Sequence, residues 1–187
     1  MKHKLLSLLS IALLLMQCKK DEPSPEEQLP AATQTGANTF GCLINGQTWE
    51  PNGPIILSYW PSYKVTYDSL RNSGRLTILV ARIIREANDN QRFVISVNSI
   101  QQAGRYRIDG VACEIDYHNP LNKGACKDFF NTQYYNRGDS THVQGRLTIT
   151  RFDRQKKIVA GVFDFTLSKP NCDTVRITKG RFDRQYF

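Results

Sequence analysis

The residues of this chain that could do acid–base or metal chemistry are few, and the best placed lie in one stretch. In Val111–His118 the residues Glu114, Asp116 and His118 stand at every second position, so a strand would place their side chains on one face. A histidine beside carboxylates can act as a general base or help to hold a metal ion. An exposed strand face carries such residues as well, and we favour that interpretation. None of the GxSxG, HExxH, SxxK, P-loop or GxGxxG motifs is present. The sequence therefore assigns no catalytic residue, metal or cofactor, and a hydrolase with an unrecognised site remains an alternative.

Cysteines are the second group of reactive residues. Cys42, Cys113, Cys126 and Cys172 form an even set, which in an exported protein indicates two disulfides. The four allow three pairings. We favour Cys113–Cys126 and Cys42–Cys172, which would close a short and a long loop worth roughly 3 and 5 kcal/mol on the chain-entropy model. A zinc site is the alternative, but the sequence has no CxxC pair and only three histidines.

Two groups of aromatic residues are candidates for binding a partner. The first lies in the stretch SYWPSYKVTY and is represented by Tyr59 and Trp60, with Tyr63 and Tyr67 close by. The second lies in the long irregular segment Asn119–Gly138 and consists of Phe129, Phe130, Tyr134 and Tyr135. Exposed aromatic rings can stack on sugars or anchor a protein partner. Packing into the core is the alternative, and we favour it for the first group.

The start of the chain predicts where the protein resides. Lys2 and Lys4 precede an apolar run of about a dozen residues, too short for a bilayer that needs about 20 but typical of a signal peptide. Cys18 follows directly and resembles the lipidated cysteine of the bacterial lipobox, although Gln17 departs from the usual small residue there. We therefore expect a signal peptide over residues 1–17 and a lipid anchor at Cys18 in the outer membrane.

The segment after the anchor, residues 18–38, is rich in Pro, Glu and Thr and has almost no bulky apolar residue. Such a composition predicts a flexible tether. Within it, Lys20-Asp21-Glu22 resembles a surface-export signal of Bacteroidota lipoproteins, which would place the anchor in the outward leaflet; the periplasmic face is the alternative. The remaining residues, 39–187, are long enough for a single domain.

The net charge of +8 resides entirely in this domain, because four cations and four acids before it cancel. A basic exported domain can prefer anionic partners such as lipopolysaccharide or acidic glycans. Solvated arginines alternating along strand faces are the plainer explanation, which we favour. A nucleic-acid partner is not expected outside the inner membrane, and no nucleic-acid motif is present.

Alternating apolar residues and turn signals predict an all-β domain. Asn45-Gly46 indicates a type I′ hairpin, since both residues tolerate a positive φ. Gly104–Asp109 and Val111–His118 are expected to form another hairpin, and a long hairpin is expected to turn around Arg154–Lys157. The fold predicted is an antiparallel β-sandwich of about nine to eleven strands, with a flattened barrel as the alternative.

Two further stretches bear on the organisation of the domain. Arg75–Arg85 has apolar residues at both odd and even positions and is rich in Thr, Ile and Val. This pattern predicts a central strand that is covered on both faces. Arg151–Gln155 and Arg181–Gln185 both read RFDRQ. This recurrence is either chance or the mark of two equivalent strand ends, and no other spacing repeats to indicate a solenoid.

Three pieces together carry a family resemblance. They are Thr39–Trp49, Gly145–Phe165 and Arg176–Phe187, and in this order after a lipobox they resemble a family of Bacteroidota lipoproteins of unknown function. Lys179 stands where that family usually has an acid or Thr. The resemblance implies an envelope lipoprotein with a β-rich domain and brings no catalytic residue. We therefore expect a non-catalytic envelope lipoprotein that binds a glycan or protein partner, with a structural role in the envelope as an alternative.

Overall fold

The computed structural model describes residues 22–52, 62–84, 89–108, 110–115, 142–168 and 174–187; for 83–84, 89–90, 92–93 and 110–115 it describes the backbone alone. The described elements are one short 3₁₀ turn, Arg71–Ser73, and ten strands. The strands are β1 (Thr39–Ile44), β2 (Gln47–Trp49), β3 (Tyr63–Asp68), β4 (Arg75–Ile84), β5 (Asp89–Val97), β6 (Gly104–Arg107), β7 (Gly110–Ile115), β8 (His142–Asp153), β9 (Ile158–Ser168) and β10 (Val175–Gln185). Within these residues no helix has the length and apolar character needed to cross a bilayer.

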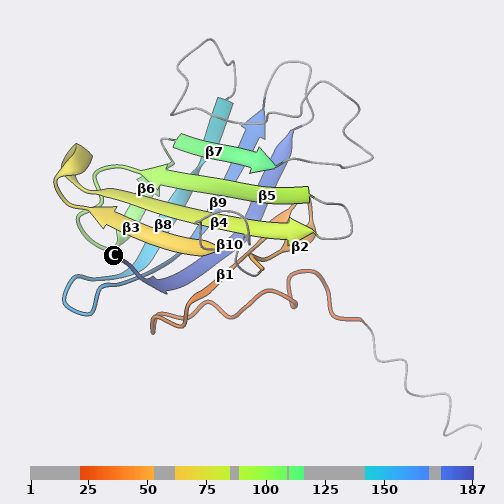
Figure 1. The fold of residues 1–187 in the computed structure, drawn as a ribbon, viewed down its shortest axis with the longest axis horizontal. Coiled ribbons are helices and arrows are strands. Elements are labelled where there is room, and N and C mark those ends of the chain that lie inside the picture. Colours follow the sequence, from red (N-terminus) through yellow and green to blue (C-terminus); the bar gives the residue numbers. More distant parts are fainter. Residues whose placement is uncertain (1–21, 53–61, 85–88, 109, 116–141, 169–173) are drawn as a thin grey trace, which may run out of the picture.

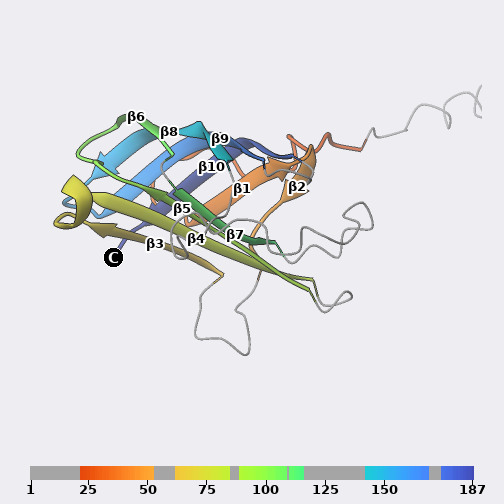
Figure 2. The same cartoon turned by 90° about the horizontal axis from the view of Figure 1, so that it is seen from above.

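The strands form two antiparallel sheets stacked face to face. One sheet has the order β2-β1-β10-β9-β8-β6, and the other has the order β3-β4-β5-β7. Figure 2 shows the two layers edge on, and in Figure 1 their strands cross steeply. Because the strands make two separate sheets instead of one closed sheet, the antiparallel sandwich is confirmed. β4 lies between β3 and β5, as expected for the apolar stretch that starts at Arg75.

The core lies between the two layers and follows from alternation along the strands. On β8 and β9 every second residue faces inward, and Leu147, Ile149, Phe163 and Leu167 are almost wholly buried. The predicted long hairpin is confirmed, since β8 and β9 pair along their whole length and turn at residues 154–157. Burying side chains of this size contributes about 1.5–3 kcal/mol each, which makes this layer contact the main source of stability.

The Asn45-Gly46 hairpin is also confirmed. Ile44 pairs with Gln47 across a two-residue turn, and φ is 50° at Asn45 and 85° at Gly46. These positive values are those of a type I′ turn, which matches the natural twist of two strands. The side chain of Asn45 accepts a hydrogen bond from the amide of Arg176, which fixes the hairpin to β10.

The hairpin predicted from Gly104 to His118 is wrong. β6 pairs with β8 in the six-stranded sheet, whereas β7 pairs with β5 in the four-stranded sheet. The chain crosses from one layer to the other between them, at the buried residue Ile108. Alternation identifies the buried face of each segment but not its partner, and both segments satisfy the same pattern as edge strands of opposite sheets.

Residues 22–38, which we call the strap, differ from the flexible tether expected there. The strap lies along the outer face of the six-stranded sheet and is drawn in orange in Figure 1. Leu29 is only 7% exposed, and Pro30 packs so closely on Gly41 of β1 that a methyl group would not fit there. Thr48 of β2 donates a hydrogen bond of 2.8 Å to the carbonyl of Pro25. One buried leucine and several polar contacts thus order a segment whose composition favours disorder.

Candidate functional site

The strap is fastened to the sheet at Asp183, a wholly buried residue of β10. Its carboxylate accepts hydrogen bonds from the hydroxyl of Thr33 (2.7 Å) and from the amides of Thr35 (2.8 Å), Gly36 (2.8 Å) and Ala37 (3.1 Å). Consecutive amides that converge on one anion form a concave nest. We call this arrangement the clasp.

The environment of the clasp keeps Asp183 charged. Burial by itself raises the pKa of this carboxyl, because it disfavours the ionised form. The hydrogen bonds from Thr33, Ala37, Thr35 and Gly36 act in the opposite direction and together outweigh burial, so the pKa lies below the ordinary value for aspartate. The clasp is therefore a buried anion held by neutral donors, a structural arrangement in which the carboxylate has no proton to give.

The two RFDRQ stretches lie on either side of β9, offset from each other by two residues. Arg151 of β8 and Asp183 of β10 are both paired with Ala160 of β9, from opposite sides. Each stretch uses its first arginine to hold the strap: Arg151 donates to the carbonyl of Gln34, and Arg181 donates to the carbonyl of Pro30. The recurrence thus corresponds to two strand segments that are offset by two residues across β9 and that both bind the strap.

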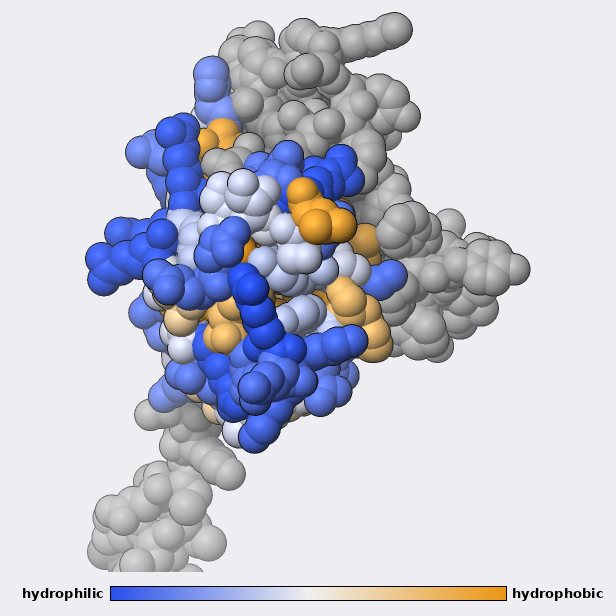
Figure 3. Space-filling view, turned by 90° about the vertical axis from the view of Figure 1, so that its left-hand side faces the viewer, coloured by the Kyte–Doolittle hydropathy of each residue, from blue (hydrophilic) through white to orange (hydrophobic). Residues whose placement is uncertain are grey.

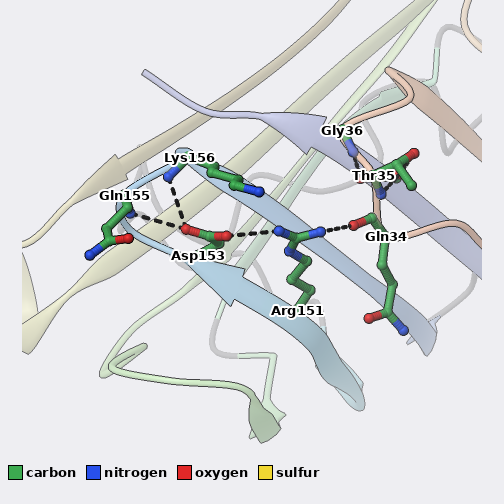
Figure 4. A network of polar contacts seen from close by, with 8 residues as sticks. Gln34, Thr35, Gly36, Arg151, Asp153, Gln155 and Lys156 are labelled. Atoms are coloured by element: carbon green, nitrogen blue, oxygen red, sulfur yellow. Dashed lines mark hydrogen bonds and ion pairs between the residues drawn. The ribbon is translucent and has the colours of Figure 1, made fainter.

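Figure 4 shows how the first copy is braced. Asp153 accepts hydrogen bonds from the amides of Lys156 and Gln155 in the β8–β9 turn. Its carboxylate also forms an ion pair with the guanidinium of Arg151 at 2.7 Å. The amide of Lys156 and the side chain of Arg151 lower the pKa of Asp153. A continuous polar path therefore runs from this turn through Asp153 and Arg151 to the strap at Gln34.

The other end of the strap is held by ion pairs. Glu26 lies 3.0 Å from the ammonium of Lys179 and 3.9 Å from the guanidinium of Arg181. Both Glu26 and Lys179 are about half exposed, so these contacts are screened by solvent and individually weak. The firm attachment of the strap is therefore the clasp, and the Glu26 end is the looser one.

Beyond the strap, the outer face of the six-stranded sheet is rich in cations. We call this surface the basic face, and it consists of Arg105, Arg107, Arg146, Arg176, Lys179 and Arg181. The strand register places these residues in rows across the sheet: Arg107 is paired with Arg146, which is paired with Asp164. A second row runs from Arg105 through Thr148 and Val162 to Arg181.

A groove separates the strap from the basic face. Its volume is about 380 Å³, and its lining includes Ala32 of the strap together with Val162, Asp164, Lys179 and Arg181 of the sheet. Val162 is one of the few large apolar side chains left substantially exposed in the described part, at 40%. The groove is therefore lined by both apolar and charged residues.

One predicted disulfide is not formed. Cys42 is a free thiol on β1, wholly buried in the core of the sandwich, so the expected Cys42–Cys172 bridge is wrong. Its side chain points inward between the layers, where it packs with aromatic and aliphatic neighbours, and burial raises the pKa of the thiol. The alternation that placed Cys42 inward was right. The side chain of Cys113, and Cys126 and Cys172, lie outside what the structure describes.

Most of the other residues singled out in the sequence also lie outside the described residues. These are Cys18, the side chain of Glu114, Asp116, His118, and the binding candidates Tyr59, Trp60, Phe129, Phe130, Tyr134 and Tyr135. Of the first aromatic stretch, Tyr63 and Tyr67 are described. Tyr63 is 5% exposed, and Tyr67 packs against the core while its hydroxyl donates to the carbonyl of Ile100 at 2.8 Å. The preference for core packing is therefore confirmed at Tyr67.

Tyr67 belongs to an aromatic cluster at one end of the sandwich. Its ring centroid lies 4.9 Å from that of Phe152 and 5.6 Å from that of Tyr186. The guanidinium of Arg154 lies over the rings of Tyr67 and Phe152. Figure 3 looks onto this end and shows a mainly hydrophilic surface with a few hydrophobic residues. Because Arg154 occupies the faces of the rings, the cluster is a packed cap on the core.

The two parts of the site that sequence reasoning missed are the clasp and the basic face. Asp183 is separated from its amide donors by almost 150 positions, so no local pattern links them. The RFDRQ recurrence was the available signal. Across the described residues, no three His, Cys, Asp or Glu side chains gather in a way that could hold a metal ion.

Fold and site together define an antiparallel β-sandwich with a docked N-terminal strap and a basic outer face. Comparisons with protein-family models, with curated proteins and with solved structures found no match. The function is therefore argued from the geometry and chemistry of the chain itself.

Proposed function

We propose that this chain is a cell-envelope lipoprotein, anchored to the outer membrane through Cys18, whose sandwich binds a glycan or protein partner without catalysis. The observation that supports it best is the basic face, where charged side chains stand exposed on a rigid sheet beside a groove. The described acids with the clearest environments, Asp183 and Asp153, are instead committed to holding backbone amides. Exposed and regularly spaced side chains on a sheet suit recognition better than proton transfer.

The strap gives the proposed anchor a definite geometry. Glu22, the first described residue, lies only four positions along the chain from Cys18. Four residues span at most about 14 Å when fully extended. A strap that stays docked would thus hold the sandwich close to the membrane, whereas a fully flexible tether would let it range several times farther.

The anchor is tested by replacing Cys18 with Ser in the full-length protein expressed in a bacterium with a lipoprotein pathway. We expect the wild-type protein to stay with outer-membrane vesicles after washing in high salt, and the variant to be lost from them. Mass spectrometry of the N-terminal peptide should show an acylated cysteine in the wild type only. An unmodified Cys18 in the membrane-bound wild type would refute the anchor.

The binding role is tested on the full-length protein in non-ionic detergent. A glycan array and photo-crosslinking in intact cells together cover the two kinds of partner. We expect either saturable binding to a defined glycan or a reproducible crosslink to one envelope protein. Failure of both, with a protein that retains its β-sheet circular dichroism spectrum, would reject the proposal.

A further inference from the structure

The cations of the basic face form a two-dimensional array. Neighbouring strands lie about 4.8 Å apart, and side chains on one face recur about every 6.7 Å along a strand. Arg105 and Arg107 are successive outward residues of β6, and Arg146 of β8 lies directly beside Arg107. Arg176 and Lys179 continue the array on β10, two strands away. Positive charge thus repeats in both directions across the sheet.

Few acids compensate this charge. Asp164 pairs with Arg146 at 3.2 Å, but both side chains are more than half exposed, so the pair holds neither of them firmly. Glu26 of the strap pairs with Lys179. Arg105, Arg107 and Arg176 have no acid within ion-pair distance among the residues that the structure describes.

The opposite surface of the sandwich has a different character. The outward residues of β3, β4 and β5 whose side chains are described include Thr66, Thr77, Leu79 and Val94, with Lys64 and Arg75 as cations and Asp68 opposite Arg75 in the strand register. Leu79 and Val94 are paired with each other across neighbouring strands. Among the described residues, positive charge is therefore denser on the outer face of the six-stranded sheet than on the opposite surface.

The side chains between the cations can bind hydroxyl groups. Thr148 lies in the same outward row as Arg105, and Gln144 and Thr166 lie in the row of Arg176. Threonine hydroxyls and glutamine amides both donate and accept hydrogen bonds. An array of guanidinium groups with polar side chains between them matches a chain of sugars that carries carboxylates or sulfates at intervals.

The strap favours a linear ligand over a flat one. It covers the outer face of β1 and β2, where Pro30 lies on Gly41 and Thr48 is bonded to Pro25. The open part of the face is thereby bounded on one side by a raised segment of chain, with the groove along the boundary. A polymer strand can lie beside such a ridge, whereas a planar lipid surface would meet the ridge first.

We propose that the basic face binds a linear anionic polysaccharide, its carboxylates or sulfates paired with Arg105, Arg107 and Arg146 and its hydroxyl groups bound by the polar side chains between them. This inference rests on the proposed binding function and specifies its ligand class. Binding of this kind depends on many weak ionic contacts, so it weakens steeply as salt rises.

The test uses the full-length protein in non-ionic detergent with polygalacturonate as the probe and uncharged dextran of equal length beside it. The triple variant Arg105→Gln/Arg107→Gln/Arg146→Gln removes three charges from the basic face. Its matched control, Lys64→Gln/Arg71→Gln/Lys156→Gln, removes three exposed charges elsewhere on the described surface. All six side chains are exposed, so both variants should fold, which their thermal unfolding verifies.

We expect the wild type to bind polygalacturonate but not dextran, with affinity that falls between low and physiological salt. The face variant should bind about tenfold more weakly, since three ionic contacts are lost together, and the control variant should stay within about twofold of the wild type. Equal losses in the two variants would show that net charge alone acts and would overturn the inference.

Two other results would also overturn it. Face-dependent binding to anionic phosphatidylglycerol vesicles without binding to polygalacturonate would assign the face to a lipid surface. A glycan-array or crosslinking hit that the face variant leaves unchanged would place the partner elsewhere on the molecule. In that last case the proposed binding function survives while this ligand class fails, so the two failures are told apart.

Discussion

Replacing Asp183 by Ala should release the strap while leaving the sandwich folded. The carboxylate of Asp183 is the acceptor for the Thr33 hydroxyl and for three successive amides. Without it these donors would be buried against an apolar methyl group, which they avoid by detaching into water. The sandwich core lies on the other face of the sheet and makes no use of this side chain, so the loss should stay local.

The size of the effect follows from the geometry of the clasp. A hydrogen bond to a charged group contributes about 1.5–3 kcal/mol, but summing four of them overshoots, because burying the carboxylate itself costs several kcal/mol. Removing one partner from a buried charged network typically costs about 3–5 kcal/mol. Taking the lower value, the equilibrium between docked and undocked strap shifts by roughly a hundredfold.

Amide hydrogen exchange measures this directly. We expect exchange at Thr35, Gly36 and Ala37 to quicken by roughly a hundredfold in the variant, while amides of β9 keep their protection. The control is Asp164→Ala, which removes an exposed carboxylate from the same sheet and should leave all three amides unchanged. Unaltered exchange at the three amides in Asp183→Ala would refute the clasp as the attachment of the strap, and loss of protection throughout β9 would refute its independence from the core.

Three further outcomes are expected. The pKa of Asp183 is lowered on folding, so the clasp contributes its full stability at pH above about 4 and loses it as the pH falls through the lowered pKa. Protection of the strap amides against hydrogen exchange should therefore decline below about pH 4. The buried hydroxyl of Tyr63 makes no well-formed hydrogen bond among the described residues, and its one polar contact, with the backbone of Asp183, is weak; Tyr63→Phe should therefore leave stability unchanged or raise it by up to about 1 kcal/mol in urea unfolding. A loss of more than that amount would indicate a partner for the hydroxyl. Cys42 is buried and its pKa is raised, so iodoacetamide should alkylate it only after unfolding, as read by peptide mass spectrometry under non-reducing conditions; rapid labelling of the native protein would contradict its burial.

Where the fold could be predicted, the decisive information was local. The Asn45-Gly46 turn and the β8–β9 hairpin join strands that are adjacent in the chain, so turn chemistry and parity together determine their pairing. The segments that became β6 and β7 are also adjacent and equally regular, yet they belong to different sheets. Alternation along the chain places Ile108 inward whether the two segments form a hairpin or lie in different sheets. The sequence pattern therefore could not distinguish a hairpin from a crossing between layers.

The strap was missed for a related reason. Composition measures how much apolar area a segment can bury, and by that measure residues 22–38 should remain free. What orders them is a set of donors that meet an anion from the far end of the chain, together with Leu29. Neither the buried state of Asp183 nor its partners can be read from the charge of one aspartate in RFDRQ.

The strap and the basic face are not independent of each other. Lys179 and Arg181 belong to the basic face, and both are partly neutralised by Glu26 while the strap is docked. Arg181 also donates to the carbonyl of Pro30 in the strap. A polyanion that binds the face as proposed and extends to these two cations would therefore compete with the strap for them. Since such competition is reciprocal, a bound polyanion should weaken docking of the strap by the same factor that docking weakens the polyanion. The firm attachment at Asp183 lies outside this competition, which confines the effect to the Glu26 end of the strap, the end that leads toward Cys18.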